Sequence, residues 1–398
     1  MPLTLLPGHR VVGETRSGYW VEVGSREEPY RAFVPKPLPP DPGVTLSELD
    51  AELSGRADRA LGRLDGTAEV FPDIEVFLSV WLLREAVYSS QIEGTQSSLS
   101  DLLLFEADRT AEAVDDLTET ANYVDAVNAG IASLDRLPVS MRLLREAHAR
   151  LLASGRGSEK QPGEIRTTQN WIGGTRPGNA RYVPVPPQYL PDALADLENF
   201  LNDVPARTPL LVKIALAHAQ FETIHPFLDG NGRVGRLLIV LLLQAEGALR
   251  RPLLYVSLFL KRHRDEYYER LQRIRTEGDW EAWVRFFLEA VETTAEDAVA
   301  TARSAMRLFV EDERRIRDRA GKAAASLARI FTVLQRSPIA TAKMLEARTG
   351  LANPTVLSAI NVLVDLGILR ELTGKRRNRT FGYDAYLAIL RARDDVDA

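Results

Sequence analysis

Residues 225–236 bring together, within one short segment, side chains and backbone types that suit phosphate chemistry. The segment reads HPFLDGNGRVGR. Gly230, Asn231 and Gly232 all tolerate positive φ, so that successive backbone N–H groups can converge on one anion. A helix is predicted over 233–245, and its N-terminal dipole would add positive potential at the same place. The segment therefore predicts an anion-binding loop that opens a helix.

The charged residues of this segment extend the prediction to a nucleotide with several phosphates. Arg233 and Arg236 are three positions apart and share one helix face, where two guanidinium groups suit a polyphosphate. Asp229 supplies a hard oxygen ligand of the kind that Mg²⁺ takes when it bridges phosphates. His225 stands four residues before Asp229 and can accept a proton near neutral pH. A base, a metal ligand, a phosphate nest and an arginine clamp are thus encoded side by side.

Other interpretations of the glycines and histidines fit the sequence less well. Residues 230–235 satisfy G-x-G-x-x-G, but a dinucleotide fold needs a preceding β-strand, and 215–224 reads as a helix. The chain also lacks a Walker A lysine and the other signature segments of a protein kinase. His218, Glu222 and His225 share a helix face, yet a di-metal bundle needs a second Glu-x-x-His, which the sequence does not contain. A plain helix start with solvated arginines would not explain why so many roles coincide.

These residues match the Fic motif, H-x-F-x-(D/E)-G-N-G-R-x-x-R, at every fixed position, so the chain resembles the Fic family. The resemblance implies a helical core that binds ATP with Mg²⁺, or alternatively with Mn²⁺. It also implies transfer of AMP to Ser, Thr or Tyr hydroxyls of a protein, with this chain itself among the candidate targets. A homodimer is a further expectation from relatives.

The resemblance also implies a role for each residue of the motif. His225 would deprotonate the target hydroxyl, and Asp229 would hold the metal. Phe227 would be a core anchor, and Tyr267 would border the adenine, although an aromatic residue there is also typical of a core. Phosphate binding would fall to Gly230, Asn231, Gly232, Arg233 and Arg236, the last of which would reach the γ-phosphate.

The segment 160–187 is rich in Gly, Pro, Thr and Asn, and we expect a short hairpin around 182–185. It resembles the Fic flap, which docks a target segment by strand addition. Arg181, Tyr182 and Val183 are the expected docking residues. A plain surface hairpin remains the alternative.

A second segment, Ser-Ser-Gln-Ile-Glu-Gly at 89–94, fits the inhibitory pattern of the family, (S/T)-x-x-x-E-(G/N). Ser89 and Glu93 would carry the inhibition, because a carboxylate there can pair with Arg236 and take it from the γ-phosphate. In relatives that also remove AMP, the same glutamate would orient a water. An exposed glutamate near a helix end is the alternative interpretation.

Helical spacing of apolar residues from Thr45 onward predicts a mainly α fold. The expected fold class is a Fic helical core with a β-hairpin flap, a helical N-terminal region and a C-terminal winged helix-turn-helix. Residues 1–43 show no such spacing and end in a proline-rich stretch, so we expect an irregular strap there. The expected domains are an N-terminal Fic-associated region with the inhibitory helix (1–115), a Fic catalytic core (116–317) and the winged helix-turn-helix (318–398).

The winged helix-turn-helix is predicted from the pattern of 340–382. A first helix over 341–347 would turn at Gly350 into a second helix capped by Asn353. Seven Lys and Arg against three Asp and Glu in 340–382 give 7 − 3 = +4. The predicted basic wing contains Lys375, Arg376, Arg377 and Arg379. DNA contact and protein contact are both consistent with this pattern, so a nucleotide-sensing, DNA-binding transcriptional regulator is the alternative function.

Composition excludes several other classes of protein. The chain has 398 residues, a formal net charge of −5 and no cysteine. Disulfides, thiolate metal sites and cysteine nucleophiles are therefore excluded. The strongly apolar run 237–243 is far shorter than a membrane span, and the first residues do not read as a signal peptide. We therefore expect a cytoplasmic protein without a membrane partner.

Overall fold

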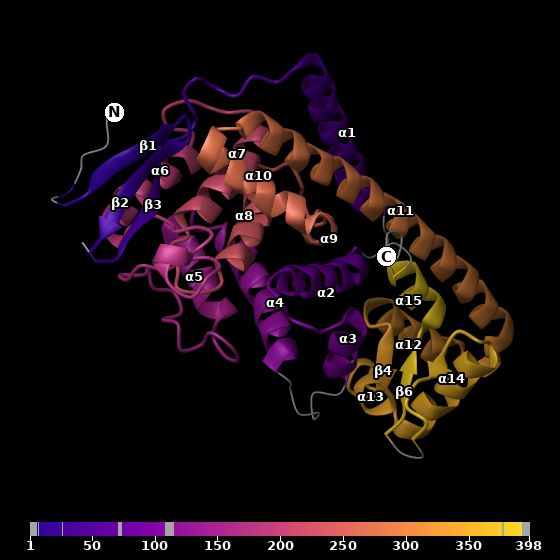
Figure 1. Ribbon diagram of the computed structural model, residues 1–398. Helices are drawn as coiled ribbons and strands as arrows, with labels where there is room; N and C mark the ends of the chain where they lie inside the picture. The colour runs from indigo at the N-terminus through magenta and orange to yellow at the C-terminus, as the bar shows by residue number, and fades with distance from the viewer. Residues whose placement is uncertain are drawn as a thin grey trace.

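The computed structural model describes residue 6 and the ranges 8–25, 27–70, 74–107, 115–375 and 378–391. It is mainly helical, with one small antiparallel sheet near each end of the chain. Figure 1 shows the first sheet at one end of an elongated molecule, the central helices between, and the C-terminal elements at the other end. No helix in the described ranges is both long and apolar enough to cross a membrane.

The N-terminal region forms three strands, so the prediction that residues 1–43 are irregular is wrong for 10–35. The proline-rich stretch expected to be a strap or linker, 35–42, has no helix. Strands β1 (Arg10–Thr15), β2 (Gly18–Gly24) and β3 (Pro29–Pro35) pair in order as antiparallel neighbours. Val21 pairs with Ala32, and both are fully buried. The aromatic and β-branched residues of β2 and β3 are typical of strands, and the proline-rich stretch begins only where β3 ends.

Fifteen helices labelled α1 to α15 make up most of the described chain. The helices predicted at 118–135, 139–153, 190–203, 210–223 and 233–245 are confirmed within a few residues. In chain order the bounds are α1 Glu48–Val70, α2 Glu75–Ile92, α3 Leu99–Ala107, α4 Asp115–Ser133, α5 Met141–Leu151, α6 Leu190–Leu201, α7 Leu210–Ile224, α8 Asn231–Ala245, α9 Ser257–Arg262, α10 Arg264–Glu277, α11 Trp280–Ala320, α12 Ala324–Arg336, α13 Ala342–Thr349, α14 Asn353–Asp365 and α15 Asp384–Arg391.

Helices α7 and α8 form the centre of the core and hold the motif between them. Every residue of α7 from Leu211 to Ile224 is buried, as is almost all of α8. A helix that is buried on all sides must be apolar all round, which explains the continuous run at 237–243. The 41-residue helix α11 runs along the central helices toward the C-terminal elements (Figure 1). The indole N–H of Trp283 on α11 donates to the Ala215 carbonyl of α7 at 2.8 Å. The loop between α7 and α8 is therefore held by rigid elements.

The C-terminal elements pack a helical pair against a second three-stranded sheet. Strands β4 (Ile339–Thr341), β6 (Thr380–Gly382) and β5 (Arg370–Glu371) lie in that order, beside α13 and α14. Gly350 makes the turn between these helices with φ of 67°. Asn353 is the first residue of α14 and not its cap, which is Ala352, so that prediction is wrong by one position. The predicted wing residues Arg376 and Arg377 lie outside the described residues.

The segment that connects α5 to α6 contains less regular structure than the predicted hairpin. Its one bridge among the described residues joins Ile172 and Tyr182 as antiparallel partners. Two 3₁₀ turns of three residues each, Pro177–Asn179 and Pro187–Tyr189, are its other regular elements. Proline and glycine recur along this stretch, and proline lacks the backbone N–H that strand pairing needs, so a longer β-ladder cannot form.

Candidate active site

The loop between α7 and α8 is shaped by backbone turns that particular residues permit. His225 ends α7 in a left-handed conformation with φ of 53°, and Gly230 precedes α8 with φ of 75°. The Asn231 side chain closes the loop, because its Oδ1 accepts from the Phe227 N–H at 2.8 Å and its Nδ2 donates to the Phe227 carbonyl at 2.9 Å. The amide of Asn231 is thus engaged with the loop, and only its backbone N–H is left to face a phosphate.

A histidine that the sequence did not single out supports this loop from α5. His148 is fully buried; its Nδ1 accepts from the Gly163 N–H at 2.8 Å, and its Nε2 donates to the Asp229 carbonyl at 3.0 Å. Its ring stacks on Phe227 with centroids 3.8 Å apart. Burial lowers the pKa of His148 to about 4, so the neutral ring makes both bonds. His148 therefore positions the backbone that carries Asp229.

His225 lies in the site as a neutral imidazole. Its carbonyl accepts from Arg166 Nε at 2.9 Å, which fixes the backbone at the end of α7. Its Nδ1 is buried and has no hydrogen-bond partner among the described residues. Burial, then the charges of Arg166 and Arg275, lower the pKa of His225 to about 3. A neutral imidazole that lines the cavity can accept a proton from a bound hydroxyl.

The predicted contact between the segment 89–94 and the motif is present. Arg236 is 1% exposed, and its Nε donates to Ser89 Oγ at 2.9 Å. Its Nη2 donates to the Ser89 carbonyl at 2.9 Å and to Glu93 Oε1 at 2.8 Å. Burial alone would raise the pKa of Glu93, but the charge of Arg236 and its hydrogen bond hold that pKa below its usual range. The pair is therefore ionic.

The Glu93 carboxylate lies against the first turn of α8, where the sequence predicts an anion. A Cβ at position 232 would overlap Glu93 Oε1, so a larger residue there would displace the carboxylate. The side chain of Glu93 is 32% exposed, which leaves it open to the cavity. The first backbone N–H groups of a helix lack intrahelical acceptors and attract an anion. Glu93 thus lies beside the first turn of α8, where the sequence predicts phosphate binding.

Arg233 forms an ion pair with the buried carboxylate of Glu119, which the sequence did not single out. Its Nη1 lies 3.3 Å from Glu119 Oε2, and both side chains are buried. Arg156 also reaches Glu119, at 2.9 Å, and Asp229 lies 3.9 Å from Arg233. Burial raises the pKa of Glu119, and the charges of Arg233 and Arg156 oppose that rise. Arg233 thereby links the loop to α4.

One cavity of about 330 Å³ brings together part of the predicted site. Its lining does not include the predicted residues Ser89, Val183, Asp229, Gly230, Asn231 and Arg233. Tyr267, predicted to border the adenine, lines this cavity but is 1% exposed, and its hydroxyl lies 2.9 Å from His218 Nε2. Its main contacts are those of a core residue. The neighbouring Tyr268 is less buried and lines the same space. The lining residues are Glu93, Ile172, Gly173, Arg181, Tyr182, Glu222, His225, Gly232, Arg236, Arg264, Tyr267, Tyr268, Leu271, Gln272 and Arg275.

Two of the three expected docking residues are buried in the segment that covers this cavity. The Tyr182 hydroxyl donates to the Thr223 carbonyl at 2.7 Å, and the Arg275 guanidinium lies 3.8 Å from its ring centre. The Val183 carbonyl accepts from the Phe33 N–H of β3 at 3.1 Å. Arg181 alone of the three is exposed. Tyr182 and Val183 therefore anchor the segment.

The described residues offer a single carboxylate, and no larger set, to a metal at this loop. Asp229 Oδ1 accepts from the Gly230 N–H at 2.6 Å. No cluster of three or more His, Asp or Glu suited to a metal occurs in the described ranges. Mg²⁺ commonly takes one or two carboxylates together with substrate phosphates, so this donor set fits such an ion only when phosphates complete it.

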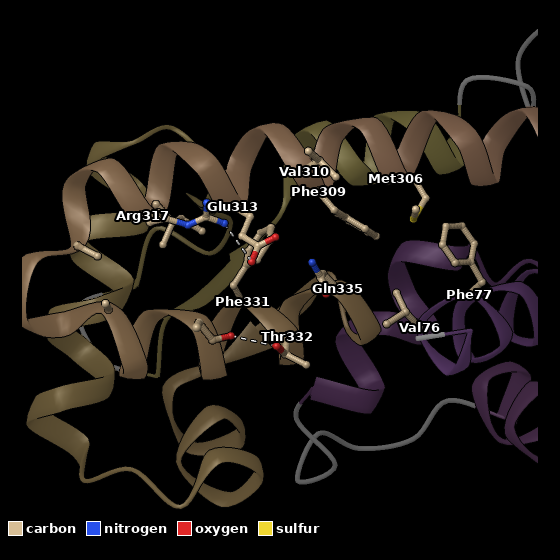
Figure 2. Close-up of a pocket in the computed structure, with 14 residues that line it drawn as sticks. Val76, Phe77, Met306, Phe309, Val310, Glu313, Arg317, Phe331, Thr332 and Gln335 are labelled. Atoms are coloured by element: carbon tan, nitrogen blue, oxygen red, sulfur yellow. Dashed lines mark hydrogen bonds and ion pairs between the residues drawn. The ribbon is translucent and has the colours of Figure 1, made fainter. Parts of the chain in front are cut away.

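A second cavity, of about 360 Å³, lies between α2, α11 and α12. Figure 2 shows Phe309 of α11, Phe331 of α12 and Phe77 of α2 around it. Its polar groups include Glu313 and Arg317, which form an ion pair at 3.6 Å. Its lining contains no histidine and no residue of the motif 225–236, so the first cavity is the better candidate site.

Comparison with known proteins agrees with this geometry. The description "Fic/DOC family N-terminal" matches residues 51–132, and "Fic/DOC family" matches residues 138–243. The second match contains the whole motif from His225 to Arg236, and the first contains Ser89 and Glu93.

Named relatives and one solved structure support the same assignment. The chain is similar to "Protein adenylyltransferase Fic" of Aedes aegypti, 31% identical over 256 residues, which are 63% of this chain and 48% of that protein. It is similar to "Protein adenylyltransferase fic-1" of Caenorhabditis elegans, 32% identical over 169 residues, which are 42% of this chain and 30% of the relative. The matches thus span half or less of these relatives. A Fic family protein from Desulfovibrio desulfuricans G20 shares the fold, with a TM-score of 0.55 and 20% identity over 85% of this chain and 97% of that one. Residues 51–132 and 138–243 of this chain are therefore Fic/DOC family domains.

Proposed function

We propose that this protein transfers AMP from ATP to a hydroxyl group of a protein substrate, with this chain itself among the candidate targets. The single observation that carries the proposal is the shared cavity of His225, Gly232 and Arg236. A neutral base, a helix start and a buried guanidinium there face one space that is large enough for a small ligand. The relatives named protein adenylyltransferase support the same activity.

In the proposed reaction the substrate hydroxyl oxygen attacks the α-phosphorus of ATP. The new O–P bond forms as the bond between the α-phosphorus and the bridging oxygen to the β-phosphate breaks, and diphosphate leaves. His225 accepts the hydroxyl proton, because its ring is neutral in the nucleotide-free site. The free N–H groups at the start of α8 and the Arg236 guanidinium stabilise the phosphate charge. Catalysis rests mainly on positioning and charge.

Mg²⁺, or Mn²⁺ in its place, would be held by Asp229 together with the phosphates of ATP. The ion would neutralise charge on the leaving diphosphate. The protein's part is to fix Asp229, which His148 achieves by its hydrogen bond to the Asp229 carbonyl.

We further propose that the protein as described is inhibited by Glu93. The carboxylate lies against Gly232 and is hydrogen-bonded to Arg236, so both phosphate-binding groups are engaged. A nucleotide must displace Glu93 before its γ-phosphate can reach Arg236. If the protein also removes AMP from a target, the same carboxylate would orient a water that hydrolyses the bond between the hydroxyl oxygen and phosphorus, which releases AMP and restores the hydroxyl.

Labelling with α-³²P-ATP tests the activity. Glu93→Gly is expected to incorporate AMP into proteins of a lysate, or into itself, more strongly than the wild type. His225→Ala in the Glu93→Gly chain should abolish the signal, because the base is gone. Glu313→Gln is the control, since it removes an exposed carboxylate that pairs with Arg317 on α11. If Glu93→Gly labels no protein in several lysates, the proposed activity is wrong.

DNA binding through the C-terminal elements is a second candidate function. Helix α14 exposes Thr355, Ser358 and Asn361 and buries Val356 and Ile360, as a winged helix that reads DNA would require. Salt-sensitive retention of the protein on immobilised DNA, reduced by changing Ser358 and Asn361, is the test. The cytoplasmic location, the homodimer and the domain bounds at 115 and 317 stay predictions.

A further inference from the structure

Helix α8 admits two carboxylates against its backbone, one turn apart. A Cβ at position 232 would lie 2.1 Å from Glu93 Oε1, and a Cβ at position 235 would lie 2.3 Å from Glu222 Oε1. Neither glycine has a positive φ, so the missing side chain, and not the backbone conformation, is what lets each carboxylate lie against α8. Arg236 directly follows the second glycine, and both carboxylates line the cavity that contains it.

Glu222 is a buried carboxylate without a role in the function proposed above. It lies on α7, is 7% exposed, and its Oε1 has no hydrogen-bond partner among the described residues. Burial raises the pKa of Glu222 to about 7, the charge of Glu93 adds to that rise, and Arg236 and Arg275 oppose it. Leaving a buried polar atom without a partner is costly, so such an atom calls for an explanation.

When Glu93 leaves Arg236, the buried guanidinium lacks a counter-charge, and Glu222 can supply one. Arg236 is 1% exposed, and Glu93 is its carboxylate partner in the described structure. A buried guanidinium that loses its counter-charge is strongly destabilising. Withdrawal of Glu93 would also remove the charge that opposes ionisation of Glu222. The second carboxylate would then become an anion beside Arg236 just when the first one departs.

We propose that Glu222 is a positioning residue that pairs with the Arg236 guanidinium when Glu93 has left it. The inference rests on the proposed function and adds a second state of the same site. In that state Glu222 keeps Arg236 charged and oriented toward the start of α8, ready for a phosphate. The switch between inhibited and active protein is then an exchange of carboxylates on one arginine.

Glu85 is the rival partner, since it is also buried and near Arg236. Its Oε1 already accepts from Tyr123 at 3.1 Å and from the Ser257 hydroxyl at 2.5 Å, and its Oε2 accepts from the Ser257 N–H at 3.3 Å. Pairing with Arg236 would break these bonds. Glu85 therefore serves as the matched control.

A double-mutant cycle in thermal unfolding at pH 7.5 tests the exchange without relying on activity. Glu222→Gln should lower the Tm of the Glu93→Gly chain by several degrees more than it lowers the Tm of the wild type. Glu85→Gln should lower both by the same amount. Equal effects of Glu222→Gln in the two backgrounds would overturn the inference.

A kinetic measurement separates positioning from general stability. In the Glu93→Gly background, Glu222→Gln should raise the KM for ATP by about tenfold, as expected for one weakened charge-assisted contact, with a smaller change in kcat. Gly235→Ala, which displaces the Glu222 carboxylate, should reproduce the effect, and Glu222→Asp should restore part of it. An unchanged KM in both variants would overturn the inference. A Glu93→Gly chain that shows the Tm coupling but transfers no AMP would contradict the proposed function and leave the exchange intact.

Discussion

The two neighbouring serines at the end of α2 offer a sharp test of the contact that restrains Arg236. Ser89 and Ser90 are both fully buried in the last turn of the helix. Ser89 Oγ accepts from Arg236 Nε at 2.9 Å, whereas Ser90 Oγ has no hydrogen-bond partner among the described residues. Changing each to alanine therefore separates the loss of this hydrogen bond from the loss of a buried hydroxyl.

The expected difference follows from the charge of Arg236. A hydrogen bond to a charged group contributes about 1.5–3 kcal/mol, and Ser89→Ala leaves a buried guanidinium N–H without its acceptor. Ser90→Ala removes a hydroxyl that was costly to bury, and both changes share the gain of about 0.5 kcal/mol in helix propensity. With about 2 °C per kcal/mol for a larger domain, Ser89→Ala should melt about 3–6 °C below Ser90→Ala.

Differential scanning calorimetry of the two variants and the wild type measures this difference. AMP labelling should rise in Ser89→Ala, to a smaller extent than in Glu93→Gly, because Arg236 keeps its bond to Glu93. Ser90→Ala should label like the wild type. If the two variants melt within about 1 °C of each other, the contact does not contribute as the geometry indicates.

Three further predictions concern the loop around the motif. His148→Ala should lose about 3 kcal/mol of stability and weaken ATP–Mg²⁺ binding by calorimetry, since His148 holds the Asp229 carbonyl, whereas exposed His263→Ala should do neither. Burial lowers the pKa of the His225 ring to about 3, so NMR of the nucleotide-free protein should show no titration of this ring between pH 5 and 8. Its contribution to stability should fall as the pH drops below 6.5, because only the unfolded chain binds a proton there. An NMR midpoint near pH 6.5 would contradict this prediction. Asp229→Asn should abolish the Mg²⁺ dependence of ATP binding and leave metal-free binding largely intact.

Residues that act through local geometry could be predicted from the sequence. The loop 225–236 depends on Gly230 and Asn231 at consecutive positions, and backbone preference alone requires such a turn before α8. Phe227 was expected to be a core anchor and is fully buried. The N-terminal strands were missed although β2 and β3 have strand-like composition, because the prolines that follow β3 dominate the local pattern.

Partners that lie far apart in sequence could be identified only where a family pattern supplied them. The bond between Glu93 and Arg236 joins positions 143 residues apart, and only the resemblance pointed to it. Glu119 lies 114 residues from Arg233, and no pattern marked that pair. Glutamates of equal local appearance are common in helices, so sequence cannot tell which one will be buried beside an arginine.

The sequence by itself determined the chemistry that this protein can perform, because base, phosphate nest and arginines follow one another within a single loop and helix start. Tertiary structure alone decided the state of that site. It brought the end of α2 and the helix α7 against α8, which placed Glu93 at Gly232 and Glu222 at Gly235, next to the buried Arg236. Packing of distant helices sets which charges share a low-dielectric cavity, and the pKa values and pairing within it follow from that proximity.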